Sequence, residues 1–174
     1  MRKCVPVLVA VIVLVGGCSR AVEPQAVAEP TRWDPCSITP EQIGATGLDP
    51  AYRDVGWGEG IVVQDWARCS FRPVGFDVPY VFNVRSSLNR TVEEARENPS
   101  NVEGRDLDVD GRDAFQYKTE VARSVNDCNV AVDLPPGVVV FTVNYMHVDD
   151  GVDPCPILLE HIDDVKSALP ATTK

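Results

Sequence analysis

The feature that most constrains the fold is a set of cysteines spread over the middle and end of the chain: Cys36, Cys69, Cys128 and Cys155. Four cysteines allow three pairings. We favour Cys36–Cys69 with Cys128–Cys155, because each bridge closes a loop of about 30 residues within one half of the chain. A metal site is the alternative use of these thiols, but zinc sites usually contain a C-x-x-C pair and this sequence has none. In an exported domain, an even number of cysteines implies disulfides, here two.

The N-terminus predicts such an export. Arg2 and Lys3 give a positive start, and the apolar run that follows covers only residues 4–15. A membrane-spanning helix needs about 20 apolar residues, so this run is typical of a secretory signal rather than of a permanent span. It ends in Val15-Gly16-Gly17-Cys18, which resembles the lipobox of bacterial lipoproteins.

In proteins with a lipobox, the cysteine thiol receives a diacylglycerol before cleavage, and the cysteine then becomes the mature N-terminus. We therefore expect residues 1–17 to be removed as a signal peptide and Cys18 to be lipidated. Two acyl chains suffice for stable membrane anchoring. The alternative is a plain secreted protein in which Cys18 is incidental.

Composition divides the rest of the chain into a tether and one domain. Residues 18–32 contain prolines and alanines without a periodic apolar pattern, so we interpret them as a flexible tether behind the lipidated cysteine. Residues 33–170 are enough for a single domain with a real core, and no second domain fits comfortably. Residues 171–174 are expected to form a frayed tail.

The charge of the chain excludes one class of partner. The formal net charge is −10, and loss of the two positive residues Arg2 and Lys3 with the signal changes it to −12. Binding of nucleic acid needs clustered Lys and Arg, so we expect no nucleic-acid partner. Anionic lipid head groups would also repel the domain, so the lipid on Cys18 must hold it at the membrane.

Alternating apolar and polar residues predict strands that bury one face. Such patterns occur within residues 61–71, 78–84 and 128–134, and Asp110-Gly111 between apolar residues is a strong hairpin signal. Residues 138–146 are β-branched and aromatic on both faces, which predicts a central strand.

Three helices are predicted from their start and stop signals. Thr39-Pro40 begins a short N-terminal helix, and Thr91-Val92-Glu93-Glu94 is a capping box that opens a middle helix. The last helix has Asp153 as its cap and ends at Pro170, and its apolar stripe consists of Cys155, Leu158, Ile162, Val165 and Leu169. We expect an α+β fold in which these helices pack on an antiparallel sheet of about five to seven strands.

Several of these pieces together resemble one family. They are Asp34-Pro35-Cys36 before a short helix, Cys69-Ser70-Phe71 in a strand, the hairpin at residues 109–114, Cys128 in a hairpin and Cys155 at the start of a helix ending in Leu169-Pro170. With the lipobox and the tether, they resemble the actinobacterial lipoproteins of the domain of unknown function 3558 family. The resemblance implies a lipid-anchored envelope protein. It implies no catalytic residues, because the family brings none.

One acidic stretch is similar to a calcium site. Asp106, Asp108 and Asp110 before Gly111 fit the first half of an EF-hand loop. The second half does not fit, because the twelfth position is Tyr117 instead of a glutamate. Along a regular strand the three carboxylates would be too far apart to share an ion. We therefore expect a hairpin with acidic outward-facing residues and no metal.

The remaining candidate residues are few. His147 lies near Asp149 and Asp150 and could be oriented as a general base, but no nucleophile motif accompanies it. His161 lies off the apolar stripe of the last helix and is predicted to be a surface residue. Three tryptophans could line a ligand groove, or could pack at the edge of the core instead: Trp33, Trp57 and Trp66.

We therefore expect a non-catalytic binding or interaction module that is anchored by lipid to the extracytoplasmic face of the cell membrane and needs no cofactor. Its expected partner is an envelope protein or a small apolar ligand. The alternatives are an envelope hydrolase, for which no nucleophile or metal motif is present, and a carrier of lipid or another small ligand, which would need a large cavity.

Overall fold

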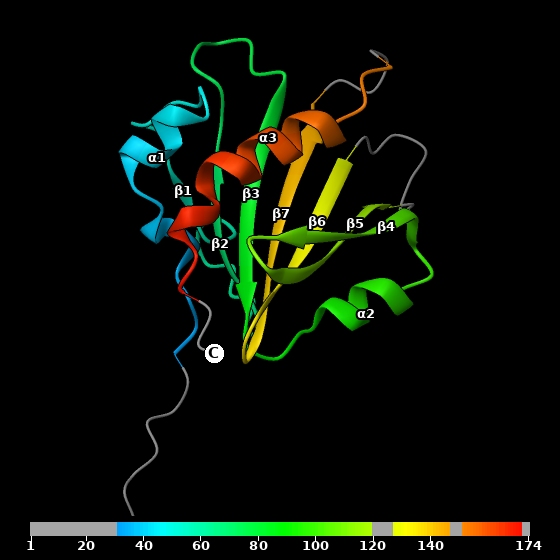
Figure 1. Ribbon diagram of the computed structural model, residues 1–174. Coiled ribbons are helices and arrows are strands. Elements are labelled where there is room, and N and C mark those ends of the chain that lie inside the picture. Colours follow the sequence, from blue (N-terminus) through cyan, green and yellow to red (C-terminus); the bar gives the residue numbers. More distant parts are fainter. Residues whose placement is uncertain (1–30, 120–126, 147–150, 172–174) are drawn as a thin grey trace, which may run out of the picture.

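One antiparallel sheet organises the domain. The computed structural model describes residues 31–119, 127–146 and 151–171 (Figure 1). The sheet has seven strands in the order β1-β2-β3-β7-β6-β5-β4, and every neighbouring pair is antiparallel. The strands are β1 Asp54–Val55, β2 Ala67–Phe71, β3 Tyr80–Ser87, β4 Asn101–Val109, β5 Arg112–Thr119, β6 Asp127–Leu134 and β7 Gly137–Tyr145. The predicted α+β class and the antiparallel sheet are confirmed.

The strand order divides the sheet into two halves that meet in its middle. Strands β1 to β3 follow one another along one half, and β4 to β7 form a meander that makes up the other. The junction between the halves is the pairing of β3 with β7, which runs in register from Tyr80 opposite Tyr145 to Ser87 opposite Val138. As expected, the long apolar strand β7 is central, because it lies between β3 and β6.

The helices begin where their capping residues predict. They are α1 Pro40–Ala45, α2 Val92–Glu97 and α3 Cys155–Val165, with 3₁₀ turns at Pro35–Ser37 and Lys166–Ala168. Thr39 and Thr91 each accept from the backbone three residues on and complete a capping box. The last helix is shorter than predicted, because its final turn is a 3₁₀ turn and Pro170 follows. No helix among the described residues is long and apolar enough to cross a membrane.

The two faces of the sheet are covered differently. Figure 1 shows α3 crossing one face with α1 beside it, while α2 lies near β4 and β5. On the α3 face, Phe82, Phe141 and Leu158 are fully buried in the main core. On the opposite face, α2 buries a smaller cluster that includes Val92 and Val140 and leaves much of the sheet uncovered.

Two disulfides connect helical turns to the sheet. Cys36 in the first 3₁₀ turn is bonded to Cys69 in β2, and Cys128 in β6 is bonded to Cys155 at the start of α3. Their Cα atoms are 5.2 Å and 5.1 Å apart, within the range that disulfides need. The predicted pairing is confirmed, and each bridge lies within one half of the sheet and its attached helical segment.

The hairpin between β4 and β5 turns at Asp110 and Gly111, as predicted. Both residues have positive φ, 53° and 75° respectively, which a two-residue type I′ turn requires. The backbone amide of Gly111 donates to Asp108 Oδ1 at 2.9 Å, so one of the acidic side chains stabilises the turn itself.

The prediction that His161 lies on the surface is wrong. His161 is only 3% exposed, and its Nε2 lies 2.9 Å from Tyr80 Oη. A stripe of apolar residues does not mark the whole buried face of a helix when a polar residue on that face has a buried partner. Helix α3 lies flat on the sheet, so its buried face also includes the position three residues after Leu158, and there Tyr80 supplies a polar partner for the imidazole.

Candidate functional site

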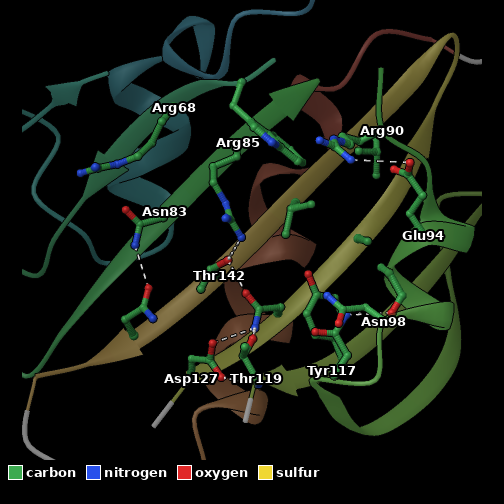
Figure 2. Close-up of a pocket in the computed structure, with 18 of the residues that line it drawn as sticks. Arg68, Asn83, Arg85, Arg90, Glu94, Asn98, Tyr117, Thr119, Asp127 and Thr142 are labelled. Carbon is green, nitrogen blue, oxygen red and sulfur yellow. Dashed lines mark hydrogen bonds and ion pairs between the residues drawn. The ribbon is translucent and has the colours of Figure 1, made fainter. Parts of the chain in front are cut away.

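A concave pocket of about 790 Å³ lies on the face of the sheet opposite α3 (Figure 2). Its floor is the middle of the sheet, and one wall is α2, which contributes Glu94 and Ala95. The opposite wall comes from the loop before β2, which contributes Trp57 and Trp66. The pocket volume lies within the range of about 300–1,000 Å³ that is usual for sites of small ligands.

The strand alternation that builds the core also builds the pocket floor. In β3, Phe82 and Val84 are buried toward α3, whereas Asn83 and Arg85 line the pocket. In β7, Thr142 lies in the pocket between two buried core residues. Because successive side chains of a strand point to opposite faces, an apolar core face here implies a polar face on the other side.

One row of hydrogen bonds crosses β2, β3 and β7. Ser70 Oγ donates to Asn83 Oδ1 at 2.7 Å, and Asn83 Nδ2 donates to Asn144 Oδ1 at 3.0 Å. Arg68 Nε donates to Ser70 Oγ at 2.7 Å. These side chains are held in fixed orientations before any ligand arrives.

A second row crosses β3, β7 and β6. Arg85 Nη2 donates to Thr142 Oγ1 at 3.2 Å, and Thr142 Oγ1 donates to Asn129 Oδ1 at 2.7 Å. Asn129 Nδ2 in turn donates to Asp127 Oδ2 at 3.0 Å, and the other oxygen of Asp127 accepts from the backbone amide of Thr119 at 2.8 Å. The buried carboxylate of Asp127 is therefore satisfied by neutral donors.

Two arginines lie directly opposite each other on this floor. Arg68 in β2 is the cross-strand partner of Arg85 in β3. Arg68 forms an ion pair with Asp54 at 2.9 Å and lies over the Trp57 ring, and Arg85 lies over the Trp66 ring at 5.6 Å. Burial lowers the pKa of Arg85 from its ordinary value, and the neighbouring charge of Arg68 acts in the same direction.

Helix α2 is held against the β4–β5 hairpin by Arg96. Its Nη2 lies 2.6 Å from Asp113 Oδ1 and its Nε lies 2.9 Å from Asp106 Oδ1. The hydrogen bond from Arg96 lowers the pKa of Asp113. This contact fixes the short helix that forms one wall of the pocket, although α2 is only a six-residue helix.

The structure brings together two of the three predicted groove tryptophans. Trp57 and Trp66 line the sheet pocket, whereas Trp33 lines a second cavity of about 300 Å³ beside Arg112 and Pro170. The indole Nε1 of Trp57 is buried and has no hydrogen-bond partner among the described residues.

Sequence reasoning missed the polar residues of the floor. Arg85, Asn83, Asn129 and Thr142 alternate with core residues along their strands, and none of them was among the predicted site residues. The sequence held no signal for them, because an alternating strand carries polar residues on its second face whether that face meets open solvent or lines a pocket.

The structure does not bring the three acidic hairpin residues together. Asp106 is bonded to Arg96, and Asp108 accepts from the turn at Gly111. No group of three metal-ligating side chains occurs within residues 31–119, 127–146 and 151–171. The candidates Cys18, His147, Asp149 and Asp150 lie outside the described residues.

A family model described as "Protein of unknown function (DUF3558)" matches residues 13–166, which include the whole sheet and the whole of α3. The chain belongs to this family. The resemblance inferred from the cysteines and the turn residues is thereby confirmed at the level of the family. No curated protein and no solved structure matches the chain. The sheet pocket of this DUF3558 domain lies entirely within the matched region.

Proposed function

We propose that this DUF3558 protein is a lipid-anchored, non-catalytic ligand-binding protein of the cell envelope, and that its ligand occupies the sheet pocket. The observation that carries the proposal is the pocket itself, a concavity of about 790 Å³ with a floor of hydrogen-bonded polar side chains and aromatic walls. Binding sites for small molecules combine these features: apolar walls for affinity and a few fixed polar groups for orientation.

The polar floor changes the expected chemistry of the ligand. Three tryptophans alone favoured a small apolar ligand. Floor residues such as Asn83 and Asn129 would lose hydrogen bonds with water beneath a wholly apolar ligand, which costs free energy. A ligand with polar groups on one side and apolar surface on the other fits this pocket better.

Binding is better supported than hydrolysis. The hydroxyl in the middle of the floor is Thr142 Oγ1, and it donates to Asn129 Oδ1 and accepts from Arg85 Nη2. Neither partner is a general base, because an amide oxygen and a guanidinium do not take up a proton near neutral pH. His161, the histidine within the part of the chain that the structure describes, lies on the opposite face of the sheet.

The anchor is supported by the sequence at residues 15–18 and by the two disulfides, which are typical of exported domains. It is tested by expressing the wild-type chain with the variants Cys18→Ala and Cys4→Ala in a bacterial host that makes lipoproteins. We expect wild type and Cys4→Ala to partition into detergent and to carry the mass of diacylglycerol. Cys18→Ala should lack both properties, and wild-type protein without the lipid mass would contradict the proposal.

The ligand site is tested by nuclear magnetic resonance with ¹⁵N-labelled protein and an extract of polar small molecules from the envelope. The three indole signals supply an internal control, because Trp57 and Trp66 line the pocket and Trp33 does not. We expect a ligand to shift the signals of Trp57 and Trp66 while that of Trp33 stays in place. Shifts confined to Trp33 would place binding elsewhere and refute the assignment.

A further inference from the structure

We infer that the sheet pocket binds a small anion that carries an apolar or aromatic body, and that the guanidinium of Arg85 holds the anionic group. The inference rests on the proposed function and specifies the chemistry of its ligand. The anionic group is a carboxylate or a phosphate, because the planar fork of an arginine matches the paired oxygens of both.

The first argument is that Arg85 is a cation without an acidic partner. The other arginines of the pocket are ion-paired: Arg68 with Asp54 at 2.9 Å, and Arg90 with Asp65 at 3.6 Å and Glu94 at 3.7 Å. No carboxylate among the described residues forms an ion pair with Arg85.

The second argument concerns the donors of Arg85. A guanidinium has five N–H donors and stays protonated in proteins. Arg85 uses Nη2 for Thr142, while its Nε is buried without a partner among the described residues. Figure 2 shows this side chain reaching from β3 across the floor toward Thr142. A buried charge with unused donors is unfavourable, so a bound anion would recover free energy that the empty pocket leaves unrecovered.

The third argument is that the nearest buried carboxylate is already satisfied. Asp127 is 6% exposed and accepts from Asn129 Nδ2 and from the backbone amide of Thr119. Burial, the largest influence, and the charge of Arg68 lower the pKa of Arg85, and the charge of Asp127 opposes them. Asp127 thus lowers the positive potential around Arg85 without forming an ion pair with its guanidinium.

The fourth argument is the apolar surface beside Arg85. Val140 is its direct neighbour in β7, and Trp66 lies under its guanidinium. Ala131 and Tyr117 extend the same cluster toward β5, and all four line the pocket. An anion bound at Arg85 would therefore place its attached body on this cluster, where burial of apolar surface adds to the affinity.

The attraction is local, because the chain as a whole has a formal net charge of −10. The overall field repels anions and does not concentrate them. Recognition must come from the arginines of the floor at short range. A bare inorganic anion gains only this contact, whereas a ligand with an apolar body gains the neighbouring cluster as well.

The experiment is a titration of the full-length chain in non-ionic detergent with four probes: phenyl phosphate, benzoate, benzyl alcohol and inorganic phosphate. We expect phenyl phosphate and benzoate to bind at least about tenfold more tightly than the neutral alcohol, the size of effect typical of a charge-assisted hydrogen bond. Calorimetry gives the affinities. The indole signals of Trp57 and Trp66 report whether binding occurs in the pocket.

Two variants of Arg85 and one control variant test its role in binding the anion. Arg85→Gln should abolish the preference for the anions, and Arg85→Lys should recover part of it, because lysine keeps the charge but not the fork. The matched control is Arg105→Gln, which removes an exposed arginine bonded to Gln116 outside the pocket. It should change the affinities by less than about twofold. If Arg85→Gln does not fold, the Nε–H signal of Arg85 in wild type must shift with phenyl phosphate and not with benzyl alcohol.

The outcomes separate this inference from the proposed function. If benzyl alcohol shifts Trp57 and Trp66 and binds as tightly as phenyl phosphate, the pocket binds ligands but the role of Arg85 is wrong. If inorganic phosphate binds as tightly as phenyl phosphate, the claim that the apolar body adds to the affinity is wrong. If no probe at millimolar concentration shifts either tryptophan, this inference is overturned, and the ligand site itself is decided by the titration with the envelope extract.

Discussion

Tyr80 Oη and His161 Nε2 lie 2.9 Å apart and join strand β3 to helix α3 inside the main core. Burial raises the pKa of Tyr80 to about 12, with smaller contributions from Tyr145 and Glu160. Burial also lowers the pKa of His161, and only Asp164 opposes that shift. Both side chains are therefore neutral in the folded domain near pH 7.

The first prediction is that acid destabilises the domain through His161. Its folded pKa is lower than the unfolded value of about 6.5, so the unfolded state takes up more protons. The stabilisation is complete above pH 6.5 or so and is lost progressively as the pH falls from there toward the lowered pKa. Urea unfolding at a series of pH values should show this slope in wild type and in Tyr80→Phe, and a flatter profile in His161→Gln.

Alkali acts on the other partner. The folded pKa of Tyr80 lies above the ordinary tyrosine value of 10.0, so stability should fall as the pH rises from 10 toward about 12. Tyr80→Phe should remove this alkaline decline and leave the acid slope of His161. An acid slope unchanged in His161→Gln would show that another group causes it.

The second prediction concerns the start of β7. A Cβ atom on Gly137 would lie 1.8 Å from the backbone oxygen of Ser87, so Gly137→Ala forces the ends of β3 and β7 apart. We expect a loss of about 3 kcal/mol or more in the free energy of unfolding. The control is Gly44→Ala in α1, where the nearest atom would be Pro50 Cβ at 3.9 Å. It should be neutral or should stabilise by about 0.5–1 kcal/mol. Equal thermal stability of the two variants would contradict the close approach at Gly137.

The third prediction concerns the disulfides. Peptide mapping without reduction should recover Cys36–Cys69 and Cys128–Cys155, and a Cys36–Cys155 peptide would contradict the structure. Replacing Cys128 and Cys155 together by alanine should lower the free energy of unfolding by about 2–4 kcal/mol. Denaturant titration checks this, with wild type under oxidising conditions as the reference.

The fourth prediction is that the acidic hairpin does not bind calcium specifically. Asp106 is bonded to Arg96 and Asp108 to the turn amide of Gly111, so calcium would have to displace both contacts. Calorimetry in physiological salt should show no stoichiometric site tighter than about 10⁻⁴ M, the affinity of weak extracellular sites. A tighter site that Asp108→Ala abolishes would overturn the prediction.

Much of the fold could be predicted because its signals are local. The capping box at Thr91, the turn at Asp110-Gly111 and the alternation in β3 each depend on residues within a few positions of one another. The disulfide pairing followed from loop length. By contrast, β1 has only two residues and exists because Asp54 and Val55 pair with β2, so nothing within it could identify a strand.

The pocket could not be predicted in the same way. Arg68, Arg85 and Asn129 lie far apart in the sequence and meet only through the order of the strands. A polar residue on a strand looks the same in the sequence whether it faces open water or a hollow. Trp57 and Trp66 line the same pocket, whereas Trp33 lies at the other cavity because its chain segment leads into the first 3₁₀ turn on the core face.

The β3–β7 junction has a consequence for how the domain comes apart. Each half is closed by its own disulfide, whereas the halves are joined across the sheet by backbone pairing and by side chains such as Arg85 with Thr142. The same side chains form the pocket floor, so the pocket exists only once both halves have docked. A ligand there acts as a clamp across the junction. A bound ligand therefore opposes separation of the two halves. Once the ligand concentration exceeds the dissociation constant, the stabilising free energy grows with the logarithm of that concentration.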